Sequence, residues 1–231
     1  MKKSFILFGL FALLLFSPTV SAQQGGLNFM LGFPQGEFKE NVDRVGFGLA
    51  GTILAWQTNN KRPFTVGLNI AYLNYGSESR KERFSTTIPD VFVDVDRTNN
   101  LANFHLLFEI SPFGGTVRPY IETLFGGSYL FTETKVSNQK GQQEIASTTN
   151  FDDWAWNYGG GFGIKFLVHR QHDDNNRLDF YVDLKARYLF GTEAEYLKEG
   201  SGYIEGGYYY FTPSKSKTDL LTVHLGVVVM F

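Results

Sequence analysis

The sequence predicts an all-β chain that closes into an eight-stranded antiparallel transmembrane β-barrel, wound as an up-and-down meander. Three observations predict this fold: strict alternation of apolar and polar residues, connections that alternate between short and long, and an apolar run at the N-terminus. Residues 179–190, DFYVDLKARYLF, show the alternation most clearly, with an apolar face from Phe180 to Phe190 and four charges on the other face. A period of two is that of a β-strand whose two faces meet different surroundings.

Residues 1–22 have the layout of a cleaved signal peptide. Lys2 and Lys3 form a basic start, an apolar run of twelve residues follows from Phe5 to Phe16, and Ser21-Ala22 is a small-residue cleavage site. Twelve apolar residues are too few to span a hydrocarbon core of about 30 Å. We therefore expect residues 23–231 to be the exported β-barrel domain, with no linker inside it.

The composition of the exported chain excludes several classes of protein. Without Lys2 and Lys3, 19 of the 21 basic residues remain against 23 acidic ones, and the net charge of −4 gives no support for binding nucleic acid. The absence of cysteine excludes disulfides. The 25 Gly, 23 Phe and 12 Tyr, with few leucine-rich helical patterns, favour an all-β chain.

Eight stretches alternate well enough to be strands, and most are long enough to cross a membrane at a tilt, which takes about nine to eleven residues. They are 26–34, 44–57, 63–76, 99–111, 118–132, 154–169, 177–190 and 217–231. The connections between consecutive strands alternate in length. Three short ones have 5, 6 and 7 residues, and the four that alternate with them have 9, 22, 21 and 26. Short turns at one end and long loops at the other are typical of outer-membrane barrels.

The alternation by itself also fits a secreted, lipocalin-like barrel with an apolar lumen and a polar exterior. Glycines gather on the polar face, where the lumen of a narrow barrel has room only for a mixture of small and large side chains. Aromatic residues on the apolar face lie towards the strand ends, as in the girdles at the two membrane interfaces. We therefore expect the apolar face to meet lipid and the polar face to line the lumen. The glycines in question are Gly46, Gly48, Gly67, Gly126, Gly159, Gly161, Gly163 and Gly226.

Three stretches carry a resemblance to a known family. The final strand, DLLTVHLGVVVMF, ends in Phe231 and resembles the assembly signal of bacterial outer-membrane proteins. LNFMLGFPQGEF (residues 27–38) and VRPYIE (residues 117–122) are similar to stretches of small Bacteroidota "porin family" barrels and of OmpX- or opacity-type barrels. The resemblance implies a cell-surface protein of a Gram-negative outer membrane. Its partners would be outer-membrane lipid, lipopolysaccharide and the outer-membrane assembly machinery.

Charged residues on the polar face form a predicted lumen charge network. Near-equal numbers of both signs favour ion pairs that fill the barrel, because an unpaired buried charge is costly. Strand neighbours suggest Glu122 or Asp183 as the partner of Lys165, and Arg118 as the partner of Glu109. This favours a structural or surface-binding role, with a narrow passive channel for small or apolar solutes as the alternative. The network consists of Glu109, Arg118, Glu122, Lys165, Asp183, Lys185 and Arg187.

Lipid A deacylases and palmitoyltransferases are enzymes built on such barrels, so the four histidines require attention. By parity His105 and His224 face the lumen, and none of the four has the serine and carboxylate neighbours of a hydrolase site. His169 and His172 lie in the charged turn HRQHDD, where spacing is weak evidence for a metal. We expect no enzymatic activity, no catalytic residue, no metal and no cofactor.

The long loops are the predicted place of function, because binding groups tend to lie on loops held by a rigid scaffold. Clustered tyrosines next to glycines suit contact with a protein, a glycan or lipopolysaccharide; alternatively, they belong to the outer aromatic girdle or pack on neighbouring loops. Residues 88–96 alternate and are expected to extend the barrel wall above the membrane. The candidate contact residues are Phe92, Tyr203, Tyr208, Tyr209, Tyr210 and Phe211.

Deleting Phe231 is expected to lower the amount of barrel inserted in cells, because the terminal aromatic residue is the predicted assembly signal. The thermal stability of barrel that has already folded should change little. Immunoblots of outer-membrane fractions measure the first quantity, and heat-modified gel mobility of purified protein measures the second. Full insertion of a chain that ends at Met230 would contradict the prediction.

Overall fold

The computed structural model describes residues 23–55, 62–83, 92–138, 144–173, 176–205 and 208–231. Eight strands form one closed barrel in the order β1-β12-β7-β6-β5-β4-β3-β2, with every neighbouring pair antiparallel. This confirms the predicted eight-stranded meander. The wall consists of β1 (Gln24–Pro34), β2 (Gly46–Leu54), β3 (Phe64–Arg83), β4 (Phe92–Ile110), β5 (Val117–Asn138), β6 (Glu144–Asp173), β7 (Asn176–Gly191) and β12 (Leu220–Met230).

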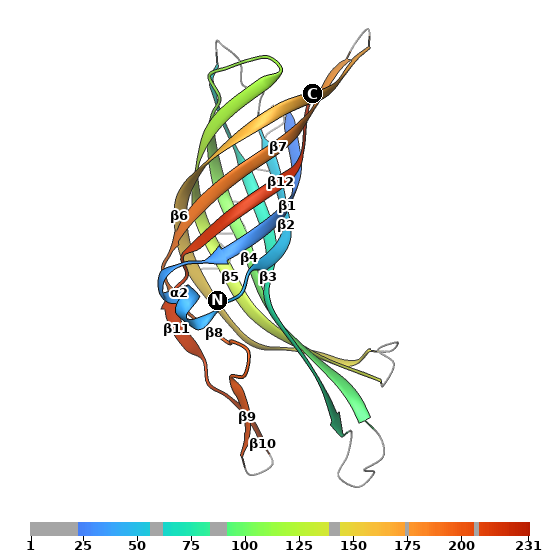
Figure 1. The fold of residues 1–231 in the computed structure, drawn as a ribbon, viewed down its shortest axis with the longest axis vertical. Helices are drawn as coiled ribbons and strands as arrows, with labels where there is room; N and C mark the ends of the chain where they lie inside the picture. The colour runs from blue at the N-terminus through green and yellow to red at the C-terminus, as the bar shows by residue number, and fades with distance from the viewer. Residues whose placement is uncertain (1–22, 56–61, 84–91, 139–143, 174–175, 206–207) are drawn as a thin grey trace, which may run out of the picture.

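The first and last strands close the barrel. β1 pairs with β12 in an unbroken register from Gln24 opposite Met230 to Pro34 opposite Leu220. The backbone N–H of Phe231 donates to the Gln23 carbonyl at 2.9 Å, so both ends of the described chain lie at the end that carries the short connections. Figure 1 shows the C-terminus at the opposite end of the molecule from α2 and β8. The predicted signal peptide, residues 1–22, lies outside the described residues.

The exterior of the barrel is apolar and its interior is largely polar. Phe162 and Leu184 point outward and are 67% and 48% exposed, whereas Lys165 and Arg187 on the same strands are 2–3% exposed. The lipocalin-like alternative requires the opposite arrangement and is therefore excluded. Outward aromatic side chains also contact one another near both ends of the wall, for example Phe64 with Phe108 at 6.2 Å and Tyr72 with Phe131 at 6.3 Å between ring centroids.

Four strands are much longer than a membrane crossing requires. β3 to β6 have 20, 19, 22 and 30 residues, against the roughly nine to eleven that span a bilayer. Their extra length projects from the end opposite the short turns, as two splayed hairpins (Figure 1). The expected extension of the wall by residues 88–96 is present for Phe92–Asp96, which belong to β4; residues 88–91 lie outside the described residues.

The last long connection contains four short strands, where the sequence predicted a simple loop. β8 (Glu193–Tyr196) pairs with β11 (Ser214–Lys217), and β9 (Gly202–Glu205) pairs with β10 (Tyr208–Phe211). Both pairs lie beyond the barrel end from which β3 to β6 project (Figure 1). We call this end, with α2 and these two pairs, the crown.

A short helix that the sequence analysis missed, α2 (Gly36–Asn41), follows β1 and covers this end of the barrel. Gly36 begins it at a φ of 53°, a conformation that favours glycine. Glu37 in its first turn accepts from the backbone N–H of Lys217 at 3.1 Å, which holds the helix against β11. Its one buried side chain, Phe38, is fully inaccessible to solvent. Six helical residues leave too short a periodic signal to be recognised in the sequence.

Candidate functional site

Ion pairs cross the middle of the lumen. The Arg187 guanidinium binds the Glu122 carboxylate through two bonds, of 2.6 and 3.1 Å, and donates a third to Asn69 Oδ1 at 3.1 Å. Lys165 Nζ lies 2.6 Å from Glu109 Oε1, and all four charged side chains are at most 3% exposed. Charge-assisted bonds of this length, in an environment without bulk water, offset the cost of burying the charges.

A second group of polar side chains surrounds Asp183. Lys185 Nζ lies 3.1 Å from its Oδ2, the Tyr120 hydroxyl donates to its Oδ1 at 2.7 Å, and Asn28 Nδ2 donates to its Oδ2 at 3.2 Å. Lys165 Nζ also lies 4.4 Å from the centre of the Tyr120 ring, which joins this group to the Glu109 pair. Lys165 therefore links the polar group around Asp183 to Glu109, beside the separate Glu122–Arg187 pair.

The pairing differs from the one expected for Lys165. Asp183 is indeed its cross-strand partner in register, but the Lys165 side chain reaches over β5 to Glu109 on β4. Glu122 on β5 likewise meets Arg187 on β7, across β6. The expectation considered only adjacent strands, whereas in a narrow barrel the side chains of next-but-one strands meet.

Glycines on the inner face of β6 make these contacts possible. Gly161 lies between Glu122 and Arg187 in the strand register, and a Cβ atom there would come within 2.9 Å of the Arg187 side chain. A Cβ at Gly163 would come within 2.5 Å of the Tyr120 hydroxyl, which bonds to Asp183. Both glycines leave the space that the crossing side chains occupy.

An apolar layer lies at the end of the lumen where Gln23 and Phe231 meet. Tyr181, Val228 and Met230 form a buried cluster, with Leu167 packed against it. Arg118, expected beside Glu109, lies here instead: its guanidinium is 5.0 Å from the centre of the Tyr181 ring and 3.2 Å from Met230 Sδ. It also donates to the Gly115 carbonyl at 3.2 Å, so the expected ion pair with Glu109 is wrong.

Two further apolar layers lie between the charges and the crown. A leucine cluster comprises Leu54, Leu107, Leu124 and Leu189. Nearer the crown, a larger cluster includes Met30, Leu73, Leu101, Leu130 and Leu220 from the wall together with Phe38 from α2. Among the charged groups a cavity of only about 10 Å³ remains, which holds roughly one water molecule. Along the described strands, the charged groups and the apolar layers together fill much of the lumen.

Phe38 holds the crown and the wall together. Its ring packs edge-on against Tyr75 of β3 at 5.7 Å and against Tyr196 of β8 at 5.1 Å between centroids. The Tyr196 hydroxyl lies 2.7 Å from Ser216 Oγ of β11, and burial raises the pKa of this hydroxyl above its ordinary value. Three separate segments of the chain are thus fixed around one aromatic side chain.

The predicted loop contact residues fall into different environments. Phe92 and Tyr210 are 38% and 46% exposed. Phe211 packs against Arg97, whose guanidinium carbon is 5.2 Å from the ring centre. This contact agrees with the alternative that the loop aromatics pack on neighbouring segments. Tyr203, Tyr208 and Tyr209 belong to the β9–β10 pair, but their side chains lie outside the described residues, as does that of His172 in the HRQHDD turn.

The apolar residues of the lumen were not predicted from the sequence. On the inner face of β4, Leu101 and Leu107 alternate with polar residues, whereas the parity argument assigns a polar character to the whole face. The signal was present as leucine at every third inward position of NNLANFHLLFE. Phe38 could not be placed by periodicity, because its contacts with Tyr75 and Tyr196 connect residues far apart in the chain.

Comparisons with known proteins give structural similarity alone. No protein-family model and no curated protein sequence matches the chain. One similar solved structure is a major outer membrane protein from Thermus thermophilus, with 13% sequence identity, a TM-score of 0.41, and coverage of 90% of this chain and 99% of that chain. Another is Neisserial surface protein A, with 11% identity, a TM-score of 0.39, and coverage of 90% of this chain and 96% of that chain. A third is Ail, the attachment invasion locus protein of Yersinia pestis, in complex with the heparin analogue sucrose octasulfate, with 15% identity, a TM-score of 0.37, and coverage of 91% of this chain and 100% of that chain. With TM-scores below 0.5, they carry no argument about the role of this chain.

Replacing Glu122 by Gln is expected to lower the free energy of unfolding by about 3–5 kcal/mol, because it leaves the Arg187 charge buried without its partner. Urea unfolding of the barrel in lipid vesicles measures this change. The double variant Glu122→Gln/Arg187→Met should recover part of the loss. Glu193→Gln is the matched control, since the Glu193–Lys215 pair is 3.7 Å long and about 60% exposed on both sides and should contribute about 0–1 kcal/mol. Equal losses in Glu122→Gln and Glu193→Gln would contradict the prediction.

Proposed function

We propose that this chain is a non-conducting barrel of the bacterial outer membrane, with a structural or surface-binding role exercised through its crown. The closed lumen is the observation that carries the proposal. Its apolar exterior suits the hydrocarbon of a bilayer, and a closed barrel leaves no unpaired strand edge there. The lumen is occupied by paired charges and apolar layers. The crown is therefore the surface available for recognising another molecule.

The architecture of the crown supports binding outside the membrane. The long hairpins β3–β4 and β5–β6 and the pairs β8–β11 and β9–β10 all project from the same end (Figure 1). The β9–β10 pair brings Tyr210 opposite Tyr203 in register, and the Tyr210 side chain is exposed. Tyrosine combines apolar area with a hydrogen-bonding tip, which suits a wet contact with a protein, a glycan or lipopolysaccharide.

The proposal includes no enzymatic activity. His105 Nε2 lies 2.7 Å from Asn157 Oδ1, and His224 Nε2 lies 2.8 Å from Thr222 Oγ1. Neither contact joins a histidine to a serine nucleophile or to an orienting carboxylate, the arrangement that activates such a nucleophile. These histidines contribute to the polar filling of the lumen.

Purified protein in planar lipid bilayers is expected to give no discrete current steps, because paired charges and apolar layers occupy the lumen. Heat-modified gel mobility of the same preparation verifies that folded barrel was present. The passive-channel alternative predicts discrete openings whose size or ion selectivity changes in Lys165→Met or Arg187→Met. Such openings in the unaltered protein would refute the non-conducting proposal.

A cysteine placed at Tyr210 should react with a membrane-impermeant thiol reagent on intact cells, because the proposal places the crown outside. The chain has no cysteine, so each single variant carries one thiol. Phe113→Cys is the matched control: Phe113 is 61% exposed in the short connection between β4 and β5 at the opposite end of the barrel, and should react only after the outer membrane is permeabilised. Labelling with the reverse pattern would show that the crown faces the periplasm.

A further inference from the structure

The long strands β3 to β6 remain joined beyond the barrel. β3 pairs with β4 as far as Arg83, β4 pairs with β5 as far as Val93, and β5 pairs with β6 as far as Glu144. The two hairpins that project in Figure 1 therefore belong to one four-stranded sheet. We call it the projecting sheet. Its edges are β3 on one side and β6 on the other.

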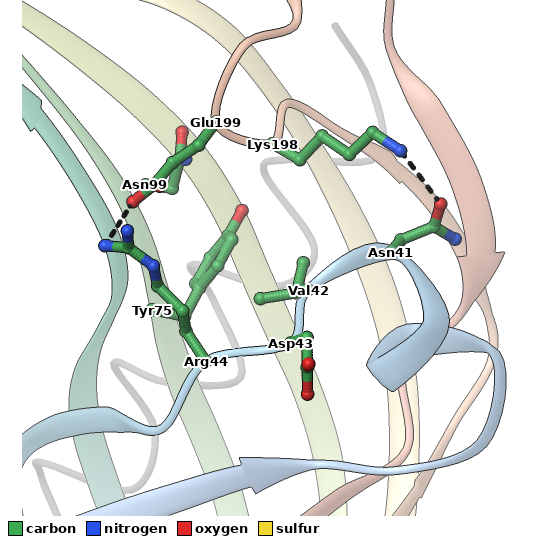
Figure 2. A pocket seen from close by; sticks show the side chains of 8 residues that line it. All are labelled: Asn41, Val42, Asp43, Arg44, Tyr75, Asn99, Lys198 and Glu199. Carbon is green, nitrogen blue, oxygen red and sulfur yellow. Dashed lines mark hydrogen bonds and ion pairs between the residues drawn. The ribbon is translucent and has the colours of Figure 1, made fainter.

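The outer edge of β3 is covered only at its start. Among the described residues, β2 pairs with β3 no further than the bulge that precedes Ser77. The Ser77 backbone N–H points to this edge and donates to Glu199 Oε1 at 3.1 Å, and Arg44 Nη1 lies 2.7 Å from the same oxygen (Figure 2). Alternate residues of a strand turn their backbone groups to the same side, so Ser79 and Lys81 present theirs at the open edge.

The outer edge of β6 is covered as far as Asp153. The Thr192 N–H donates to the Trp156 carbonyl at 2.8 Å, and the Glu195 N–H donates to Asp153 Oδ2 at 2.7 Å. Residues 145–149, nearer the tip, are exposed, and no other strand of the described chain pairs with them on that side. The projecting sheet therefore ends in two open edges, one on β3 and one on β6.

The β6 edge lacks the usual chemical protection against pairing. Residues 145–151, IASTTNF, contain no charge, proline or glycine, although these residues commonly protect exposed edges. Bulges interrupt the register with β5 on either side of residues 146–149, which remain regularly paired. By the alternation of bonds along β5, Ser147 turns its backbone groups to the open edge. An exposed edge of this kind is a template for another strand.

The charges of the two edges are complementary. Residues 77–83 of β3 contain three basic and two acidic residues, a net charge of +1. Residues 144–153 of β6 contain three acidic residues and no basic one, a net charge of −3. Two β3 edges or two β6 edges would therefore repel each other, whereas a β3 edge attracts a β6 edge.

The strand directions favour the same combination. Each neighbouring pair from β3 to β6 is antiparallel, so β3 and β6 run in opposite directions. Two copies inserted in one membrane have the same orientation. The β3 edge of one copy then meets the β6 edge of its neighbour antiparallel, whereas two like edges would meet parallel, which is the slightly less stable pairing.

From these observations we infer that neighbouring copies of this chain associate in the membrane by pairing the β3 edge of one copy with the β6 edge of the next. The projecting sheets of the two copies become one continuous sheet above the bilayer. Each copy has one edge of each kind, so the contact is heterologous and generates a ring or an open row of barrels. The partner is a second copy of this chain, and the inference does not depend on whether the lumen conducts.

Cross-linking of the full-length barrel in outer membranes tests this contact. Cells that produce Ser79→Cys and Thr149→Cys together place one thiol on each kind of edge, and the chain has no other cysteine. A short bis-maleimide should give at least fivefold more dimer in these membranes than in membranes that hold either variant alone. Absence of dimer, or equal dimer in all three, would overturn the inference. Lys135→Cys, exposed on the central strand β5, replaces Thr149→Cys as the control and should give only the single-variant level.

A change at the β6 edge connects the association to strand pairing. Ser147→Pro removes a backbone N–H from the open edge, where proline is compatible with a strand. Added to Thr149→Cys, it should lower the mixed dimer fivefold or more, while heat-modified gel mobility of the barrel stays unchanged. If Ser147→Pro lowers the amount of folded barrel, Ser147→Lys serves instead, because it places a positive charge against the basic β3 edge. Undiminished dimer in a folded variant would overturn the inference.

The outcome is separable from that of the proposed function. Barrels that stay silent in planar bilayers but give no mixed dimer refute the association and leave the non-conducting barrel standing. Discrete openings refute the non-conducting barrel, whatever the cross-linking gives.

Discussion

The bidentate pair between Glu122 and Arg187 crosses the inner face of β6, and much of the interior depends on the space that this crossing requires. The lumen of an eight-stranded barrel is too narrow for two long side chains to meet across a strand unless that strand has no inward side chain between them. Gly161 fulfils that condition for this pair, and Gly163 does so for Tyr120 and Asp183. The glycines weaken β6 as an isolated strand, but they allow the buried charges to be neutralised. A closed lumen follows from that neutralisation, since the pairs occupy the centre of the barrel.

The apolar layers on either side of the charges have a second consequence. They exclude water from the network, which strengthens each ion pair and raises the cost of leaving one charge alone. Phe38 extends the same layering beyond the wall, because its contacts with Tyr75 and Tyr196 attach α2 and β8 to the barrel end. The crown is therefore packed onto the side chains that fill the lumen.

The alternation along the strands predicted the wall in detail. Residues 177–190 were expected as a strand and form β7 from Asn176 to Gly191, with Leu184 outward and Lys185 inward. The sorting of short and long connections predicted which end carries the crown. Local pattern suffices here because a strand with one lipid face and one lumen face has a strict period of two, and slipping by one residue would bury its apolar face and expose its charges to lipid.

What the sequence alone determined is the fold class, the strand order, the direction of each face and the set of charges in the lumen. Only the tertiary structure decided their partners: Lys165 meets Glu109 across β5, and Arg118 meets Tyr181 and Met230 instead of a carboxylate. It also decided that α2 covers the barrel end and that the pairing of β3 with β4 is shifted by a bulge at Tyr75. The reason is physical. The strand to which a residue belongs, and whether its side chain points inward or outward, depend on its neighbours along the chain. Contacts across a narrow lumen depend instead on the curvature of the wall, the tilt of the strands and the lengths of side chains from strands that are not adjacent.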